Sequence, residues 1–181
     1  MIEIISGSNR AGSNSLRIAH LLLAAYQEQG VDAGLLNLQE LPPTLLNPGA
    51  YAERPKAFEP FQERVLSAHG LHVVTPEYNG SFPGALKLLI DMLRFPDSFA
   101  GKPVAYVGVA SGQWGGLRAV EQLQLIFGYR NAYSYPQRVF IAGVHDKFSA
   151  DGAFNDAELL GRLREQAAGF RTFAGRLGGR E

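Results

Sequence analysis

Cysteine is absent from the chain, which excludes disulfide bonds, thiolate catalysis and cysteine-bound metal centres. An excess of one charge is lacking too. The 17 basic and 17 acidic side chains give a formal net charge of +0, so a general nucleic-acid surface is not expected. No apolar run approaches the roughly 20 residues of a membrane-spanning helix, and the first residues lack the pattern of a signal peptide. We therefore expect a cytoplasmic protein that binds neither nucleic acid nor membrane.

The motifs of several enzyme classes are missing as well. The four histidines are scattered, without H-E-x-x-H or i,i+4 spacing, so no metal site is expected at His20, His69, His72 or His145. A G-x-S-x-G elbow is absent, which argues against serine hydrolysis. Neither the ATPase G-K-[ST] motif nor the dinucleotide-binding G-x-G-x-x-G motif is present. A mononucleotide phosphate is therefore favoured over ATP or a tightly held NAD.

The sequence does contain a repeated change of hydrophobic period. Short apolar runs predict five strands, at residues 2–6, 31–38, 72–75, 102–110 and 138–142. Apolar residues at helical spacing follow each strand, in residues 16–26, 61–66, 86–93, 117–127 and 160–177. This alternation predicts an α/β fold, a three-layer sandwich with helices on both faces of a five-stranded parallel sheet. We expect one domain over residues 1–181 and the strand order 2-1-3-4-5.

The loop after the first strand, residues 7–15, has the composition of an anion site. It combines hydroxyl side chains, an arginine and glycines just before a predicted helix, whose free N–H groups and dipole favour an anion. An ordinary helix cap at Asn14 or Ser15 is the structural alternative. A cap needs one such residue, however, and not a cluster around an arginine. We therefore predict a phosphate site at Ser8 and Arg10 together with one or more of Ser13, Asn14 and Ser15.

The loop after the third strand offers contacts for a planar ligand. Pro76 fixes the chain, Tyr78 could stack on a ring, and Asn79 could hydrogen-bond the edge of that ring. In open α/β sheets, ligands bind at this position. A plain turn between strand and helix is the alternative for the loop. For Glu77, a structural pair or a subunit contact is as compatible with the sequence as a ligand contact.

The loop after the fourth strand is rich in glycine, which lets backbone lie close to a ring. We predict that Gly112, Gly115 and Gly116 let the loop lie flat against such a ring, with Trp114 as a shield. A flexible turn with a surface tryptophan is the alternative. Because the carboxyl ends of parallel strands share one edge of a sheet, these three loops are expected to form a single crevice.

Together these motifs resemble the NADPH-dependent FMN reductase family, which comprises flavodoxin-like quinone, azo-compound and flavin reductases. The resemblance covers about residues 1–145 and is carried by residues 7–15, 76–79, 83–87, 90–91, 111–112 and 115–118. It implies a flavodoxin-like fold, FMN as cofactor, NADPH or NADH as hydride donor, and a homodimer or homotetramer. It places the FMN phosphate on the first loop. It places the flavin ring against Pro76, Glu77, Tyr78, Asn79, Ser111, Gly112, Gly115 and Gly116.

The implied function is an oxidoreductase that passes hydride from NAD(P)H through flavin to a small acceptor, such as a quinone or a free flavin. Because the flavin supplies the chemistry, no side chain is expected to act as nucleophile or general base. A flavodoxin-type electron carrier, which binds FMN without oxidising NAD(P)H, is one alternative. The zero net charge argues against the acidic docking face of such carriers. A non-catalytic module that binds a nucleotide as a signal is the other.

Overall fold

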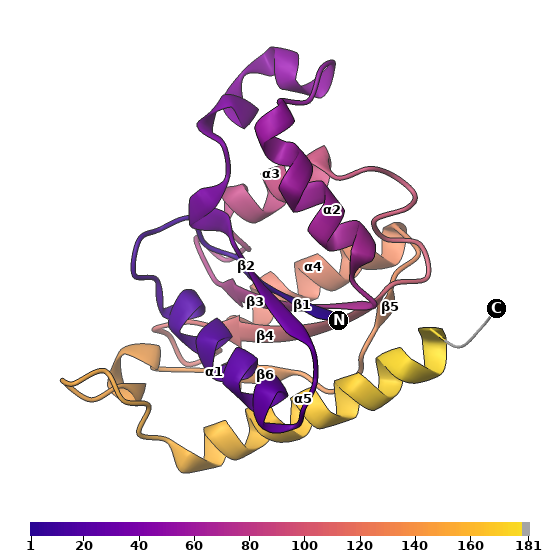
Figure 1. Ribbon diagram of the computed structural model, residues 1–181. Coiled ribbons are helices and arrows are strands. Elements are labelled where there is room, and N and C mark those ends of the chain that lie inside the picture. The colour runs from indigo at the N-terminus through magenta and orange to yellow at the C-terminus, as the bar shows by residue number, and fades with distance from the viewer. Residues whose placement is uncertain (179–181) are drawn as a thin grey trace.

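A parallel sheet runs through the middle of the computed structural model, which describes residues 1–178 (Figure 1). Its strands are β1 (Ile2–Ser6), β2 (Ala33–Asn37), β3 (Gly70–Pro76), β4 (Pro103–Val109), β5 (Tyr133–Ser134) and β6 (Val139–Ile141). The strand order is β2-β1-β3-β4-β5, and β6 also pairs with β4. The predicted order 2-1-3-4-5 is thus confirmed. The topological switch point, where the chain begins to add strands on the other side of β1, lies between β1 and β3.

The predicted fifth strand, residues 138–142, corresponds to β6, and a further short piece, β5, precedes it, so the sheet has six strands within residues 1–178 instead of the predicted five. The first piece, β5, pairs with the start of β4, and β6 pairs with its last three residues. Pro136 lies between the two pieces. Because proline has no N–H to donate, it interrupts the ladder at that point. The sequence pattern predicted the second piece and missed the first, which has only two residues.

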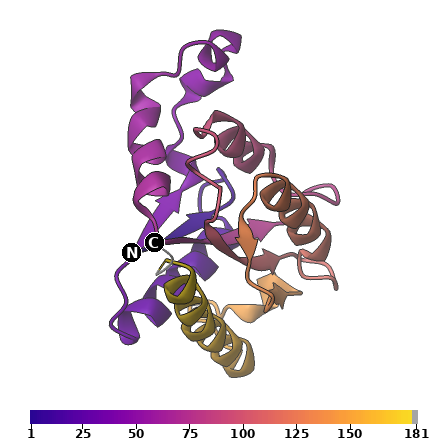
Figure 2. The same cartoon turned by 90° about the vertical axis from the view of Figure 1, so that its right-hand side faces the viewer.

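Helices cover both faces of the sheet, as predicted. One face packs against α1 (Asn14–Glu28) and α5 (Ala157–Gly178), and the other against α2 (Glu59–Ser67), α3 (Gly84–Met92) and α4 (Leu117–Tyr129) (Figure 2). Strand residues alternate between the two layers. In β1, Ile4 packs in the layer of α1 and α5, whereas Ile5 packs in the opposite layer. Both faces are therefore dry, which explains the continuous apolar runs in the sequence.

The proline-rich segment between β2 and α2 extends past the sheet as a series of short 3-10 turns. These turns are Leu38–Glu40, Pro43–Leu46, Pro48–Tyr51 and Lys56–Phe58. Proline starts two of them, where its missing N–H costs nothing and its fixed φ suits the turn. Among residues 1–178, no helix is long and apolar enough to cross a membrane.

A fully buried histidine ties the sheet to the layer of α1 and α5. The Tyr26 hydroxyl donates to His72 Nδ1 over 2.9 Å, and His72 Nε2 donates to Gln166 Oε1 over 3.2 Å. This orientation is fixed because the Gln166 amide nitrogen already donates to the carbonyls of Tyr106 and Gln137, both at 2.9 Å. Burial lowers the pKa of His72 to about 4, although the hydrogen bond to Gln166 opposes this shift.

His72 is therefore expected to make the fold sensitive to acid. Its pKa is about 4 in the folded protein and about 6.5 in the unfolded chain. The stability it provides is complete above pH 6.5 and is lost as the pH falls towards 4, because the unfolded chain takes up the proton first. By pH 5 the loss is about 2 kcal/mol. Urea unfolding measured between pH 6.5 and pH 4 should show this fall in the free energy of unfolding.

The matched variants for that experiment are His72→Gln and His20→Gln. His20 is exposed on α1, so its variant should follow the parent curve. The His72→Gln protein should be less stable at pH 7, yet its free energy of unfolding should fall less steeply between pH 6.5 and 4. Parallel curves for the parent and His72→Gln would show that His72 is not the source of the acid sensitivity.

Candidate functional site

Two adjoining cavities open at the carboxyl edge of the sheet. The first, of about 330 Å³, is lined by residues 10–15, residues 76–78, residues 109–111, Val144 and His145. The second, of about 240 Å³, is lined by Glu77, Asn79, Gly80, Ala110, Ser111, Gly112, Trp114 and Arg118. They share Glu77, Ala110 and Ser111, so they form one elongated crevice. The three predicted loops therefore meet in one place, and the crevice has the size of a small-molecule site.

The first cavity ends at the start of α1. Ser13 is the N-cap, and its side chain accepts the N–H of Leu16 over 3.2 Å. The Ser13 and Ser15 hydroxyls lie 3.1 Å apart. Within the described residues, the backbone N–H groups of Asn14 and Ser15 have no acceptor. These free donors, the hydroxyls and the positive end of the helix dipole together suit an anion such as phosphate.

Ser8 was predicted in the same loop, but the structure places it behind the cavity. It is fully buried, its hydroxyl shares a 2.8 Å hydrogen bond with the Tyr78 hydroxyl, and it accepts the Arg10 N–H over 3.2 Å. The Arg10 guanidinium lies 5.9 Å from the centre of the Tyr78 ring. Ser8 thus joins the first loop to the third and does not line either cavity.

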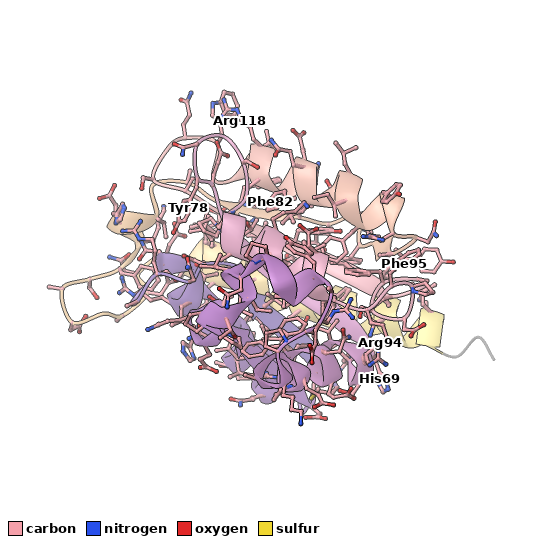
Figure 3. All side chains as sticks on the ribbon, turned by 90° about the horizontal axis from the view of Figure 1, so that it is seen from above. His69, Tyr78, Phe82, Arg94, Phe95 and Arg118 are labelled. Atoms are coloured by element: carbon pink, nitrogen blue, oxygen red, sulfur yellow. The ribbon has the colours of Figure 1, made fainter. Side chains whose placement is uncertain are left out.

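The third loop turns sharply at Asn79 and Gly80. Both have positive φ, 52° and 75°, and Tyr78 and Ser81 exchange two backbone hydrogen bonds across them. This is the pattern of a type I′ turn, which favours Asn-Gly. The turn leaves the backbone and the side chain of Tyr78 fixed at the edge of the cavity. Seen from above, Tyr78 and Arg118 lie towards the same end of the molecule, away from His69 and Arg94 (Figure 3).

Glu77 lies where the two cavities join. Its Oε1 accepts Arg118 Nη1 over 2.9 Å, and the two side chains are 12% and 53% exposed respectively. Its Oε2 is buried and has no hydrogen-bond partner in the described part of the chain. A buried carboxylate oxygen without a donor is costly. Glu77 therefore forms a structural ion pair with Arg118 through Oε1, and its Oε2 is left as an acceptor for a ligand.

The two glycines at the end of the fourth loop pack against strands. A Cβ on Gly116 would lie 2.6 Å from the Val109 nitrogen, and one on Gly115 would lie 2.9 Å from the Ile141 nitrogen. Both have positive φ, and neither lines either of the two cavities described above. By contrast, Ser111 and Gly112 do line the crevice, and Trp114, 53% exposed, lies at its second cavity. Cofactor contact by Gly115 and Gly116 stays a prediction.

The structure adds residues to the crevice that the sequence did not single out as ligands. Val144 and His145, just after β6, line the first cavity, and Arg118 lines the second. The sequence feature that could have indicated His145 is its position just after the predicted fifth strand. The carboxyl end of that strand lies at the same edge of the sheet as those of the other strands. In the sequence, Arg118 stood out only as the last residue of the motif at residues 115–118. Among residues 1–178, no group of three or more metal-ligating side chains is placed to hold a metal ion.

Comparison with known proteins gives consistent matches over most of the chain. The model of the NADPH-dependent FMN reductase family matches residues 1–146. An NAD(P)H-dependent FMN reductase of Pseudomonas aeruginosa is 33% identical, covering 97% of this chain and 95% of its own. A quinone reductase of Pseudomonas putida is 30% identical, over 86% and 84% of the two chains. The solved structure of the flavoenzyme FerB, an NAD(P)H:(acceptor) oxidoreductase of Paracoccus denitrificans, superposes with a TM-score of 0.81 at 23% identity over 97% of each chain.

Proposed function

The chain belongs to the NADPH-dependent FMN reductase family, and from this premise we propose how its crevice binds FMN and uses NAD(P)H. The protein is an FMN-dependent NAD(P)H oxidoreductase that delivers hydride to a small acceptor. The observation that carries the assignment of the site is the pair of free N–H groups at the start of α1, which open into the larger cavity among serine hydroxyls. Such a donor set matches a phosphate group.

The phosphate end of FMN is assigned to the first loop. Arg10, Ser13, Asn14 and Ser15 line the cavity there and supply a guanidinium, hydroxyls and backbone donors. Ser8 supports this site from outside the cavity, because its hydroxyl accepts the Arg10 N–H and shares a hydrogen bond with the Tyr78 hydroxyl. Charge-assisted hydrogen bonds, such as those from Arg10 to a phosphate, are about twice as strong as neutral ones.

The flavin ring is assigned to the third and fourth loops. Pro76, Glu77, Tyr78 and Asn79 line one side of the crevice, and Ser111 and Gly112 line the other. The unpartnered Oε2 of Glu77 is a hydrogen-bond acceptor that fits the N–H edge of a flavin ring. Gly115 and Gly116 act through the backbone that they position, since both pack directly on the strand ends.

When bound, FMN supplies the chemistry, accepting hydride from a nicotinamide and passing it to an acceptor. The work of the chain is to bind, orient and shield. The first loop fixes the phosphate, and the third loop presents Tyr78 at a fixed angle through its I′ turn. Trp114 stands half-exposed at the ring end, where it can cover a planar ligand and limit access of water. No side chain of the crevice is assigned as nucleophile or general base.

Reduction kinetics with a dialysed sample test this function. Apo-protein reconstituted with FMN should turn yellow, and stopped-flow mixing with NADPH or NADH should bleach the visible absorbance of the flavin. Multiple turnovers should follow when a quinone or free flavin is added. A protein that binds FMN but stays oxidised in the presence of both nicotinamides would instead be an electron carrier, and the proposed function would be wrong.

The assembly and surroundings of the protein are also proposed. We expect a homodimer or homotetramer, because Leu46, Leu125 and Tyr129 are 74–81% exposed and would gain from burial. Light scattering should give two or four times the 19.7 kDa chain mass, and a monomer at micromolar concentration would contradict it. We propose a cytoplasmic location, where NAD(P)H is available to the protein. We propose a single domain over residues 1–181, of which the last three lie outside the described residues.

A further inference from the structure

A segment far along the chain closes the phosphate end of the crevice. It follows β6, begins with the 3-10 turn Val144–Lys147, and lies beside the start of α1 (Figure 1). Asn14 Nδ2 lies 3.3 Å from His145 Nδ1, across 131 residues of sequence. His145 also lines the same cavity as Ser13 and Ser15. An imidazole from the fifth loop is thus placed beside the donors of the first loop.

The orientation of this imidazole is set by a chain of contacts. Arg17 Nη1 donates to Asn14 Oδ1 over 3.4 Å, so the other end of the Asn14 side chain, Nδ2, faces His145. An amide nitrogen can only donate, and therefore His145 Nδ1 accepts. The proton of the neutral ring is then on Nε2. We assign the Nε2–H tautomer on this basis, which leaves a donor at the rim of the cavity.

Arg17 is itself held by the same distant segment. Its guanidinium lies 3.4 Å from the centre of the Phe148 ring, and its Nη2 donates to the Gly152 carbonyl over 3.4 Å. A stacked guanidinium with fixed partners has few alternative positions. Asn14 and Arg17 are therefore positioning residues, and the contacts join α1 to the segment that carries His145.

We propose that His145 is a ligand of the FMN phosphate, donating a hydrogen bond from Nε2 to a phosphate oxygen. The proposal rests on the proposed function, since it assumes that the phosphate occupies the cavity at α1. It extends that site to the fifth loop, the one after β6, which the sequence motifs alone did not include. His145 is exposed without a ligand and has no other described hydrogen bond than that with Asn14, so its Nε2 is available.

A pair of substitutions at one position tests the proposal. His145→Leu keeps a branched side chain but removes the donor, and His145→Gln offers an amide N–H at nearly the position of Nε2. Dissociation constants for FMN and for riboflavin, which lacks the phosphate, are measured by quenching of flavin fluorescence. His145→Leu should weaken FMN binding about tenfold and leave riboflavin binding within about twofold. His145→Gln should recover most of the FMN affinity.

The controls separate the possible failures. His20→Leu removes an exposed histidine from the outer side of α1 and should bind both flavins as the parent does. If His145→Leu binds FMN as tightly as the parent, or weakens FMN and riboflavin equally, His145 is not a phosphate ligand, while the proposed function stands. If the parent itself binds no FMN, the proposed function and this inference both fail.

Discussion

Replacing Ser13 by aspartate is expected to weaken FMN binding at least a hundredfold while the apo-protein stays folded. Ser13 is the N-cap of α1, and its hydroxyl accepts the Leu16 N–H. Aspartate is an equally favoured N-cap, and a negative charge at this end of a helix contributes about 0.3–1 kcal/mol of stability. The same substitution that preserves the helix should therefore abolish the binding of an anion.

The size of the effect follows from electrostatics. Two unit charges about 4 Å apart repel by about 4 kcal/mol at the effective dielectric constant of ~20 that applies near a protein surface. Each 1.4 kcal/mol changes a dissociation constant about tenfold, so even a partly screened repulsion exceeds a factor of a hundred. The dianionic phosphate of FMN would add to it, whereas riboflavin, which has no phosphate, should be affected far less.

Ser13→Asn is the matched control. Asparagine also caps helices well and carries no charge, so FMN affinity should stay within about fivefold of the parent. Flavin fluorescence titrations of the three proteins, with urea unfolding of the apo-forms, provide the comparison. If the aspartate and asparagine variants bind FMN equally well, the phosphate does not lie at the start of α1, and the assignment of the first loop must be abandoned.

Gly116→Ala is expected to lower the free energy of unfolding of the apo-protein by about 3 kcal/mol. Gly116 has φ +89°, and an added Cβ would meet the Val109 nitrogen at 2.6 Å and Gly108 Cα at 2.8 Å. These atoms belong to the backbone of β4 and cannot move aside without breaking the ladder. The substituted chain must therefore accept an unfavourable φ, a clash, or a displaced fourth loop.

Gly112 provides a control four residues earlier in the same loop. A Cβ there would have no neighbour within 4 Å, and its φ lies outside the left-handed region. Gly112→Ala should change the free energy of unfolding by less than about 0.5 kcal/mol, although it lines the ring end of the crevice. Urea unfolding without flavin measures both. Equal stability of the two variants would show that the packing of Gly116 on β4 does not support the fold.

Much of the fold was predictable because it depends on local patterns. The runs at β1, β3 and β4 are mostly apolar and are buried along their whole length, as is typical of central parallel strands, and the helical stretches change to a period near 3.6. The two-residue β5 was not predictable, because a strand that short carries no periodicity. In the structure it pairs with the start of β4 and contacts α4, and Pro136 separates it from β6.

The candidate site was predictable to the level of loops but not of side chains. The sequence placed Ser8 among the phosphate ligands, which stays a prediction, and only the structure shows that its hydroxyl shares a hydrogen bond with the Tyr78 hydroxyl. It assigned Gly115 and Gly116 to the ring, which stays a prediction, and the structure shows that both pack closely against strand ends. His145 entered the crevice from the fifth loop without any motif to mark it.

The sequence by itself determined where strands, helices and their connecting loops fall, and hence which loops meet at the carboxyl edge of the sheet, since hydrophobic period and turn residues act over a few neighbours. Only the tertiary structure decided which side chains in those loops face the cavity. That choice depends on contacts between segments far apart in the chain, such as Asn14 with His145 and Glu77 with Arg118. Such contacts form when helices pack on the sheet, and no local pattern specifies them.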